Sequence, residues 1–133
     1  MLPGVTEALD SKASHLRRGL AAEEIAARYL RDQGLTILAR NLRCRAGEID
    51  LIVLDGDILA MIEVRQRARS HFGGALGSVT RRKQRRVLRA AQFFLQRRLE
   101  WRALVMRFDV IALDGVPDGA YALAWIKDAF RDG

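Results

Sequence analysis

Three acidic residues interrupt the stretch "GEIDLIVLDGDILAMIEVR", residues 47–65, whose apolar spacing is otherwise typical of two β-strands. They are Glu48, Asp50 and Glu63. Aspartate is depleted from strands and glutamate mildly so, and carboxylates are rarely buried without a partner or a metal. These acids therefore either face water or form a site.

The pair Asp55–Gly56 is a strong turn signal and predicts a tight hairpin with these two residues as its loop. Counting outward from this loop places Asp50 opposite Met61. Glu48 then faces Glu63, and all four side chains share one face of the hairpin. Asp50 and Glu63 become diagonal neighbours, with Cα atoms roughly 7 to 8 Å apart. A three-residue loop would instead send them to opposite faces.

Two carboxylates at this spacing are suited to metal-assisted phosphodiester hydrolysis. Mg²⁺ prefers oxygen ligands and often takes one or two carboxylates together with water and phosphate oxygens. Arg65, two residues after Glu63, lies on the same face and would stabilise negative charge that develops on phosphorus. The chain contains no phosphate-binding loop, dinucleotide-binding or serine-hydrolase motif that would indicate another chemistry.

Positive charge is concentrated in one part of the chain. Residues 65–102 hold twelve Lys or Arg and one acid, a net charge of +11, whereas the rest of the chain has a net charge of −4. This distribution favours a polyanionic partner, and nucleic acid is the commonest candidate. The alternative is a well-solvated helix face, because arginine is also a good helix former. The nucleic-acid-binding residues predicted from this segment are Arg67, Arg81, Arg82, Lys83, Arg85 and Arg86.

An amphipathic helix is predicted over Ser14–Gln33. Glu24 falls nearly opposite its apolar stripe and is expected in solvent, whereas Glu23 lies on the margin and is a candidate for the interior edge. Glu23 could equally be a boundary residue paired with Arg28 or Arg31. The apolar stripe consists of Ala22, Ile25, Ala26, Tyr29 and Leu30.

A second helix is predicted from an N-cap at Thr80 to about Leu99. Its first turns, "RRKQRR", oppose the helix dipole, which disfavours cations there, but they suit phosphate binding. Gln84 precedes the apolar positions by one turn and should point toward the sheet. The glycine-rich basic segment before this helix either closes over a ligand or only connects elements.

The remaining elements define the fold class. Strands are expected at Leu35–Ala39, Gly47–Leu54, Ile58–Arg65, Leu104–Leu113 and Tyr121–Ile126. The resulting order αβββαβ(β) predicts an α/β domain with a mixed central sheet flanked by helices. A flexible segment is expected at 1–13, followed by a single domain at 14–133. No apolar run is long enough to span a membrane, and no secretory signal is visible. The single cysteine excludes an internal disulfide. We therefore expect a cytoplasmic protein.

Six short motifs together resemble a known family. They are "AEEIAARYL", "ILARN", "GEIDLI", "IEVRQR", "FGGALGSVTRRKQ" and "RFDVIAL". From about residue 18 to 130 the chain closely resembles the YraN-like family of small bacterial proteins, a branch of the PD-(D/E)xK nuclease superfamily. The resemblance implies the restriction-endonuclease-like fold that this superfamily shares with archaeal Holliday junction resolvases.

The resemblance also assigns roles to individual residues. It implies that Asp50 is the aspartate of the superfamily signature and Glu63 its second acid, the two being ligands of Mg²⁺ or Mn²⁺. Glu23 matches the catalytic acid of the first helix, and Gln84 or Lys83 matches an auxiliary polar residue of the following helix. Glu48 has no role in the resemblance; because the hairpin count places it on the same face, we expect it to lie beside the metal ligands without binding the metal itself.

Two positions depart from the signature, and the second of them, Arg65, keeps alternative functions open. Ile49 replaces a proline, with little consequence. Arg65 replaces the usual lysine, and guanidinium cannot act as a general base, which leaves an electrostatic or phosphate-orienting role. We expect a Mg²⁺-dependent endonuclease acting on DNA, by analogy on branched DNA. The alternatives are a nucleic-acid-binding protein without catalysis and a protein-interaction module. A two-fold homodimer would suit a junction cutter, although no residue indicates an interface.

Overall fold

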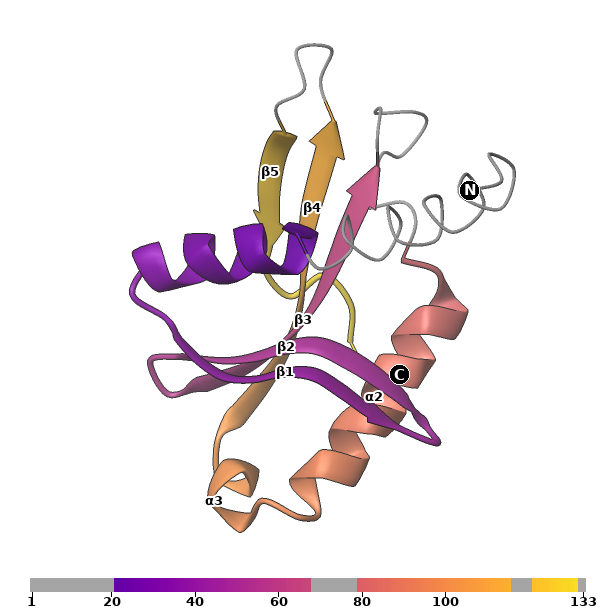
Figure 1. The fold of residues 1–133 in the computed structure, drawn as a ribbon. Helices are drawn as coiled ribbons and strands as arrows, with labels where there is room; N and C mark the ends of the chain where they lie inside the picture. Colours follow the sequence, from indigo (N-terminus) through magenta and orange to yellow (C-terminus); the bar gives the residue numbers. More distant parts are fainter. Residues whose placement is uncertain (1–20, 68–78, 116–120, 132–133) are drawn as a thin grey trace, which may run out of the picture.

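The computed structural model describes residues 21–67, 79–115 and 121–131, and its centre is a five-stranded mixed sheet (Figure 1). The strand order is β1-β2-β3-β4-β5, in which β3 and β4 are parallel and the other neighbours are antiparallel. The predicted α/β class with a mixed sheet is therefore confirmed. The strands are β1 (Thr36–Cys44), β2 (Gly47–Asp55), β3 (Ile58–Arg67), β4 (Val105–Gly115) and β5 (Tyr121–Ile126).

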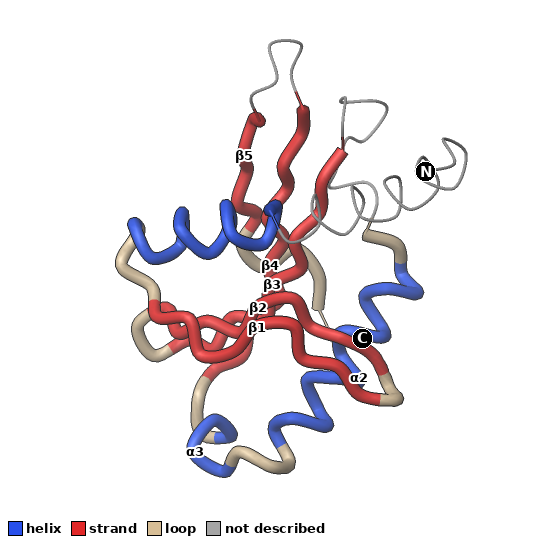
Figure 2. Tube along the Cα trace, viewed as in Figure 1, coloured by secondary structure: helices blue, strands red, loops and turns tan. Residues whose placement is uncertain are grey.

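Two helical layers cover this sheet, one on each face (Figure 2). The first helix, described over residues 21–32 and drawn in indigo in Figure 1, packs Ala22, Ala26 and Leu30 into one apolar cluster. Helix α2 (Arg81–Leu95) packs Val87 and its neighbours into a second cluster. The predicted flexible segment and the helix start at Ser14 lie outside the described residues, as does the glycine-rich segment 68–78.

The start of α2 agrees with the sequence, but its end does not. Thr80 is the N-cap, and its side-chain oxygen accepts a hydrogen bond from the backbone N–H of Lys83 at 3.3 Å. The helix ends at Leu95, and a separate short helix, α3 (Leu99–Arg102), follows. Arg102 explains this break, since its guanidinium donates to the carbonyl oxygens of Leu95 and Gln96 and so satisfies the end of α2.

The first strand is longer than expected, because β1 continues to Cys44 instead of ending at Ala39. Among the described residues it is an edge strand paired with β2 alone, so polar side chains such as Arg40 and Arg43 remain in solvent without interrupting it. The register of β1 against β2 shifts between Ile37 and Ala39. Further along β1, Asn41 has a left-handed φ of 52°, a conformation that asparagine tolerates better than most residues.

The turn between β2 and β3 lies one residue later in the chain than the sequence predicts. Asp55 pairs with Ile58, so the loop is Gly56 and Asp57, with Gly56 in the left-handed region at φ 63°. The pairing Asp50 with Met61 is therefore wrong, because Met61 pairs with Ile52. The predicted register between β2 and β3 is wrong by two residues. Because two is an even number, Asp50 and Glu63 still lie on the same face.

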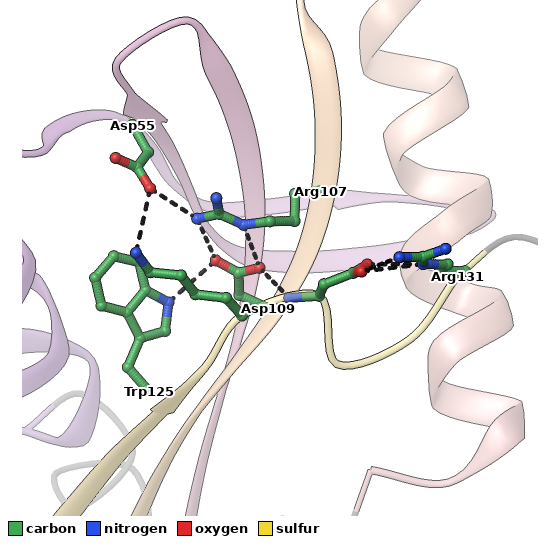
Figure 3. Close-up of polar contacts among 7 residues, drawn as sticks. Asp55, Arg107, Asp109, Trp125 and Arg131 are labelled. Carbon is green, nitrogen blue, oxygen red and sulfur yellow. Dashed lines mark hydrogen bonds and ion pairs between the residues drawn. The ribbon is translucent and has the colours of Figure 1, made fainter.

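A buried polar network joins β4, β5 and the segment after β5 (Figure 3). Asp109 is fully buried and accepts two hydrogen bonds from Arg107, at 2.8 and 2.9 Å. It also accepts from the Trp125 indole at 3.0 Å and from the backbone N–H of Asp128 at 2.9 Å. Arg107 extends the network to Asp55 at 2.9 Å. Because each Asp109 oxygen is bonded, this acid holds the sheet together and is satisfied without any ligand.

Candidate functional site

The pairing of β2 with β3 stops in the middle of both strands. The last pair is Leu51 with Ile62, whereas β3 remains paired with β4 to its end (Figure 1). Continuing the register by one step would place Asp50 across from Glu63. We call this divergence, from Asp50 and Leu51 to Ile62 and Glu63, the strand fork.

Asp50 is held in place by the backbone that the fork exposes. Its Oδ2 accepts a hydrogen bond of 2.9 Å from the backbone N–H of Val64. Beyond the fork, β2 no longer pairs with β3, so Asp50 supplies the acceptor that the Val64 N–H would otherwise find in the neighbouring strand. A buried backbone N–H without an acceptor would be energetically costly. The carboxylate therefore has a fixed position next to Glu63.

Glu63 is the most perturbed acid of the fork. Its side chain is buried, with 5% of its surface exposed. Burial raises the pKa of Glu63 to about 9, and the charge of Asp50 and a hydrogen bond with it act in the same direction, against the opposing charge of Arg65. Its Oε2 is buried and has no hydrogen-bond partner. The carboxyl group therefore needs either a proton or a cation.

Glu23 lies at the interior edge, as one of the two sequence interpretations predicted. It is 8% exposed, and its Oε1 is also buried without a hydrogen-bond partner. Burial raises the pKa of Glu23, as does the charge of Asp50, which places the first helix next to the fork. A hydrogen bond from the Asn41 side chain and the charges of Arg40 and Arg43 lower it. Nothing in the sequence pattern predicted that Asn41 would contact Glu23.

The alternative partners for Glu23 bind its neighbour instead. Glu24 forms ion pairs with Arg28 at 3.3 Å and with Arg40 at 2.9 Å, and it lies 4.0 Å from Arg31. The Glu24 side chain is 39% exposed. Glu23 is therefore the acid of this helix that is available to the fork.

Helix α2 approaches the fork through Gly47, the first residue of "GEIDLI". A Cβ atom added at Gly47 would lie 2.2 Å from the backbone oxygen of Arg86, so only glycine permits this contact. The contact brings the first turns of α2 next to the start of β2. Close packing of β2 against α2 therefore explains why the motif "GEIDLI" begins with glycine.

Two cations face the acids of the fork. Arg65 follows Glu63 on β3 and is half-buried. Burial lowers the pKa of Lys83 on α2, and the charge of Arg65 lowers it further. The charges of Glu63, Asp50 and Glu48 act on Lys83 in the opposite direction. Lys83 therefore shares an electrostatic environment with the predicted site. Its two predicted roles, as a nucleic-acid contact and as one of two matches to the auxiliary polar residue, stay predictions.

Glu48 and Gln84 have contacts that differ from those of the buried acids. Glu48 is on the surface and pairs with Arg43 at 3.6 Å, while its charge still raises the pKa of Glu63. Gln84 is half-buried, as expected, and its Nε2 donates to the carbonyl oxygen of Val79 at 3.1 Å. This bond fixes the entry to α2. A catalytic role for Gln84 stays a prediction.

The exposed side of α2 presents a basic surface, consisting of Arg81, Arg82, Arg85 and Arg86, which we call the α2 basic surface. The first turn of α2 contains no acid to offset it. Arg67 is the last residue of β3, and its side chain lies outside the described residues. These arginines stay predicted contacts for nucleic acid.

The fork fits a hard divalent cation by its donor chemistry. Two carboxylates adjoin one another, and Glu63 Oε2 is a buried acceptor with no partner. No group of three or more His, Cys, Asp and Glu side chains in the described ranges is arranged to hold a metal. Asp50 and Glu63 are the two carboxylates that adjoin at the fork, and they would be sufficient for Mg²⁺ or Mn²⁺ if water and phosphate supplied the other oxygen ligands.

Comparisons with known proteins assign the chain to a family. Residues 22–113 match the model of "Uncharacterised protein family UPF0102". A UPF0102 protein of Pseudomonas putida KT2440 is 49% identical over 119 residues, covering 90% of this chain and 96% of the relative. One of Pseudomonas entomophila L48 is 50% identical over 113 residues, covering 85% and 92%. In the described part of the chain, no helix is long and apolar enough to cross a membrane. The chain thus belongs to the UPF0102 family, which is YraN-like and is part of the restriction-endonuclease-like nuclease superfamily.

Proposed function

We propose that this protein is a metal-dependent endonuclease that hydrolyses phosphodiester bonds in DNA. The observation that carries the proposal is the pair of adjoining acids at the strand fork. Glu63 is buried against Asp50 and has an oxygen without a partner. A purely structural acid is normally fully hydrogen-bonded, as Asp109 is, so the unsatisfied oxygen supports a ligand-binding role.

Each residue of the fork would have a distinct task. Asp50 and Glu63 would hold Mg²⁺ or Mn²⁺, which when bound supplies an activated water and neutralises phosphate charge. Val64 orients Asp50 through its backbone N–H. Arg65 would bind a phosphate oxygen, since its guanidinium remains protonated and cannot accept a proton.

The α2 basic surface would position the DNA. Its arginines are exposed on the first turns of a helix whose dipole also favours anions. Contacts of this kind fix the register of a nucleic acid without reading its sequence. Branched DNA is the substrate that the relationship to junction resolvases supports, and this part of the proposal rests on analogy.

The test is cleavage of linear, flapped and four-way DNA by the purified protein with Mg²⁺ or Mn²⁺. We expect cleavage by the parent protein and a loss of about 100-fold or more in Asp50→Asn and Glu63→Gln. DNA affinity should persist in both variants, because the α2 basic surface is unchanged. Asp57→Asn, the same chemical change at an exposed turn residue, is the matched control and should retain activity.

One observation favours a second function, nucleic-acid binding without hydrolysis. Arg65 stands where the superfamily signature has lysine, so a proton-accepting group is missing at that position. The same substrates distinguish the two functions. If the parent protein cleaves no substrate with Mg²⁺ or Mn²⁺, and its salt-sensitive DNA binding weakens in Arg85→Met, nucleic-acid binding without hydrolysis replaces the endonuclease proposal.

A further inference from the structure

An aromatic side chain, Phe93, lies on the outer face of α2. Arg89, Arg86 and Arg82 precede it by four, seven and eleven residues, a spacing that places the four side chains along one side of the helix. The three arginines, which we call the arginine line, are exposed, and Phe93 is half-buried. Positive charge therefore continues from the α2 basic surface along the helix and ends at an aromatic ring.

Core packing does not account for the position of Phe93. The next residue, Phe94, packs against the apolar cluster beneath α2, together with Leu88 and Leu95. In the part of the chain that the structure describes, Phe93 packs against neither apolar cluster. An apolar ring on the outer face of an amphipathic helix contributes little to folding, because it stays in contact with water. The ring of Phe93 is therefore available for a contact outside the fold.

The surroundings of Phe93 are those of a stacking site. The guanidinium of Arg97 lies over the ring, with its Cζ atom 4.1 Å from the ring centroid. A guanidinium and a nucleobase are both planar groups that stack on an aromatic face. Arg97 is exposed, so its side chain is free to move onto a phosphate group when a base takes its place on the ring.

A ring of this kind selects unpaired bases. In a duplex the neighbouring base pairs cover both faces of each base, whereas a single strand offers these faces to a side chain. Stacking tolerates any sequence, since every base has a π face. From Arg82 to Phe93 the helix rises roughly 16 Å, which is long enough to follow about four or five nucleotides of one strand. The arginine line and the ring together thus fit a short single-stranded segment.

We propose that Phe93 is a stacking site for an unpaired DNA base, and that the arginine line holds the phosphates between this base and the strand fork. The inference rests on the proposed endonuclease function and deepens it by naming the substrate class, DNA in which a single-stranded segment adjoins a duplex. Gly47 brings β2 against Arg86, within the arginine line, so the stacking site and the fork belong to one continuous surface.

DNA binding by the metal-free protein separates a stacking contact from a charge contact. The two ligands are an oligothymidine strand and a blunt duplex of equal length. Phe93→Leu should weaken the Kd for the strand by about fivefold to 100-fold, and that for the duplex by less than about twofold. The salt dependence should not change, because no charge is removed. Phe93→Trp should retain the affinity for the strand. Arg89→Met should weaken binding of both ligands and reduce the salt dependence.

Trp101→Leu is the matched control. Trp101 also lies beneath a guanidinium, that of Arg98 at 5.0 Å, but it packs against the apolar cluster. Its replacement should lower the melting temperature and leave the affinity for the strand largely unchanged, whereas Phe93→Leu should retain the parent melting temperature. A strand that carries iodouracil gives a second readout, since irradiation should crosslink it to the parent protein at Phe93.

Three results overturn the stacking site. They are a parent protein that does not bind the strand, a Phe93→Leu variant that binds it as tightly as the parent protein, and a variant that loses affinity for strand and duplex equally. The endonuclease function is tested apart from this site. If the parent protein stacks a base on Phe93 but cleaves no substrate, the endonuclease function alone is refuted. If the parent protein and Phe93→Leu cleave flapped DNA equally well, the stacking site alone is refuted.

Discussion

At the residue scale, Glu63 links the folding of the metal-free protein to pH. Its pKa is about 9 in the folded state and 4.5 as an ordinary glutamate, so between these values the folded protein retains a proton that the unfolded chain loses. The stabilising contribution is complete below pH 4.5 and is lost as the pH rises toward 9. The slope approaches about 1.4 kcal/mol per pH unit for one proton.

Glu63→Gln should therefore remove this pH dependence, because an amide resembles the protonated acid and cannot ionise. In chelator-treated protein, we expect the variant to have the higher free energy of unfolding at pH 8 and a flatter profile between pH 5 and 9. Urea unfolding at several pH values measures both. Glu48→Gln, at an exposed acid, should keep the parent slope. An unchanged slope in Glu63→Gln would show that Glu63 is not the titrating group.

At the element scale, the position of α2 depends on one glycine. A methyl group at Gly47 would collide with the backbone oxygen of Arg86, so β2 and α2 must separate in Gly47→Ala. We expect a loss of about 1 to 3 kcal/mol in the free energy of unfolding and shifted NMR amide signals along α2. Gly34→Ala is the comparison, since a Cβ there meets no atom within 4 Å and only its φ of 88° is unfavourable. Matching α2 spectra for Gly47→Ala and the parent protein would refute the packing argument.

The helices and strands also show how much of the fold and of the site the sequence predicts. Periodicity predicted the main helices and strands, because one face of each element is buried in an apolar cluster. Asp50 and Glu63 were placed on one face despite a wrong turn, since a register error of two residues preserves side-chain alternation. The strand fork itself could not be predicted, because it depends on where β1 and β2 bend away from β3.

At the scale of the whole molecule, the proposed DNA-binding surface and the proposed metal site adjoin one another. The strand fork lies where the first helix, the sheet and the start of α2 meet, and the α2 basic surface faces outward beside it. The fully bonded network around Asp109 holds β4 to β5 and to the segment after it (Figure 3). DNA held on α2 would thus reach the acids of the fork without a large rearrangement of the sheet.

The central claim is that Asp50 and Glu63 bind a divalent cation, and calorimetric titration of the metal-free protein with Mn²⁺ tests it most directly. At pH 7 we predict saturable binding at one site, with release of the proton that Glu63 holds, so that repeating the titration in buffers of different ionisation enthalpy changes the observed heat. Glu63→Gln should weaken this binding by at least about tenfold and abolish the proton release. Equal affinity for Mn²⁺ in the parent protein and in Glu63→Gln would contradict the account.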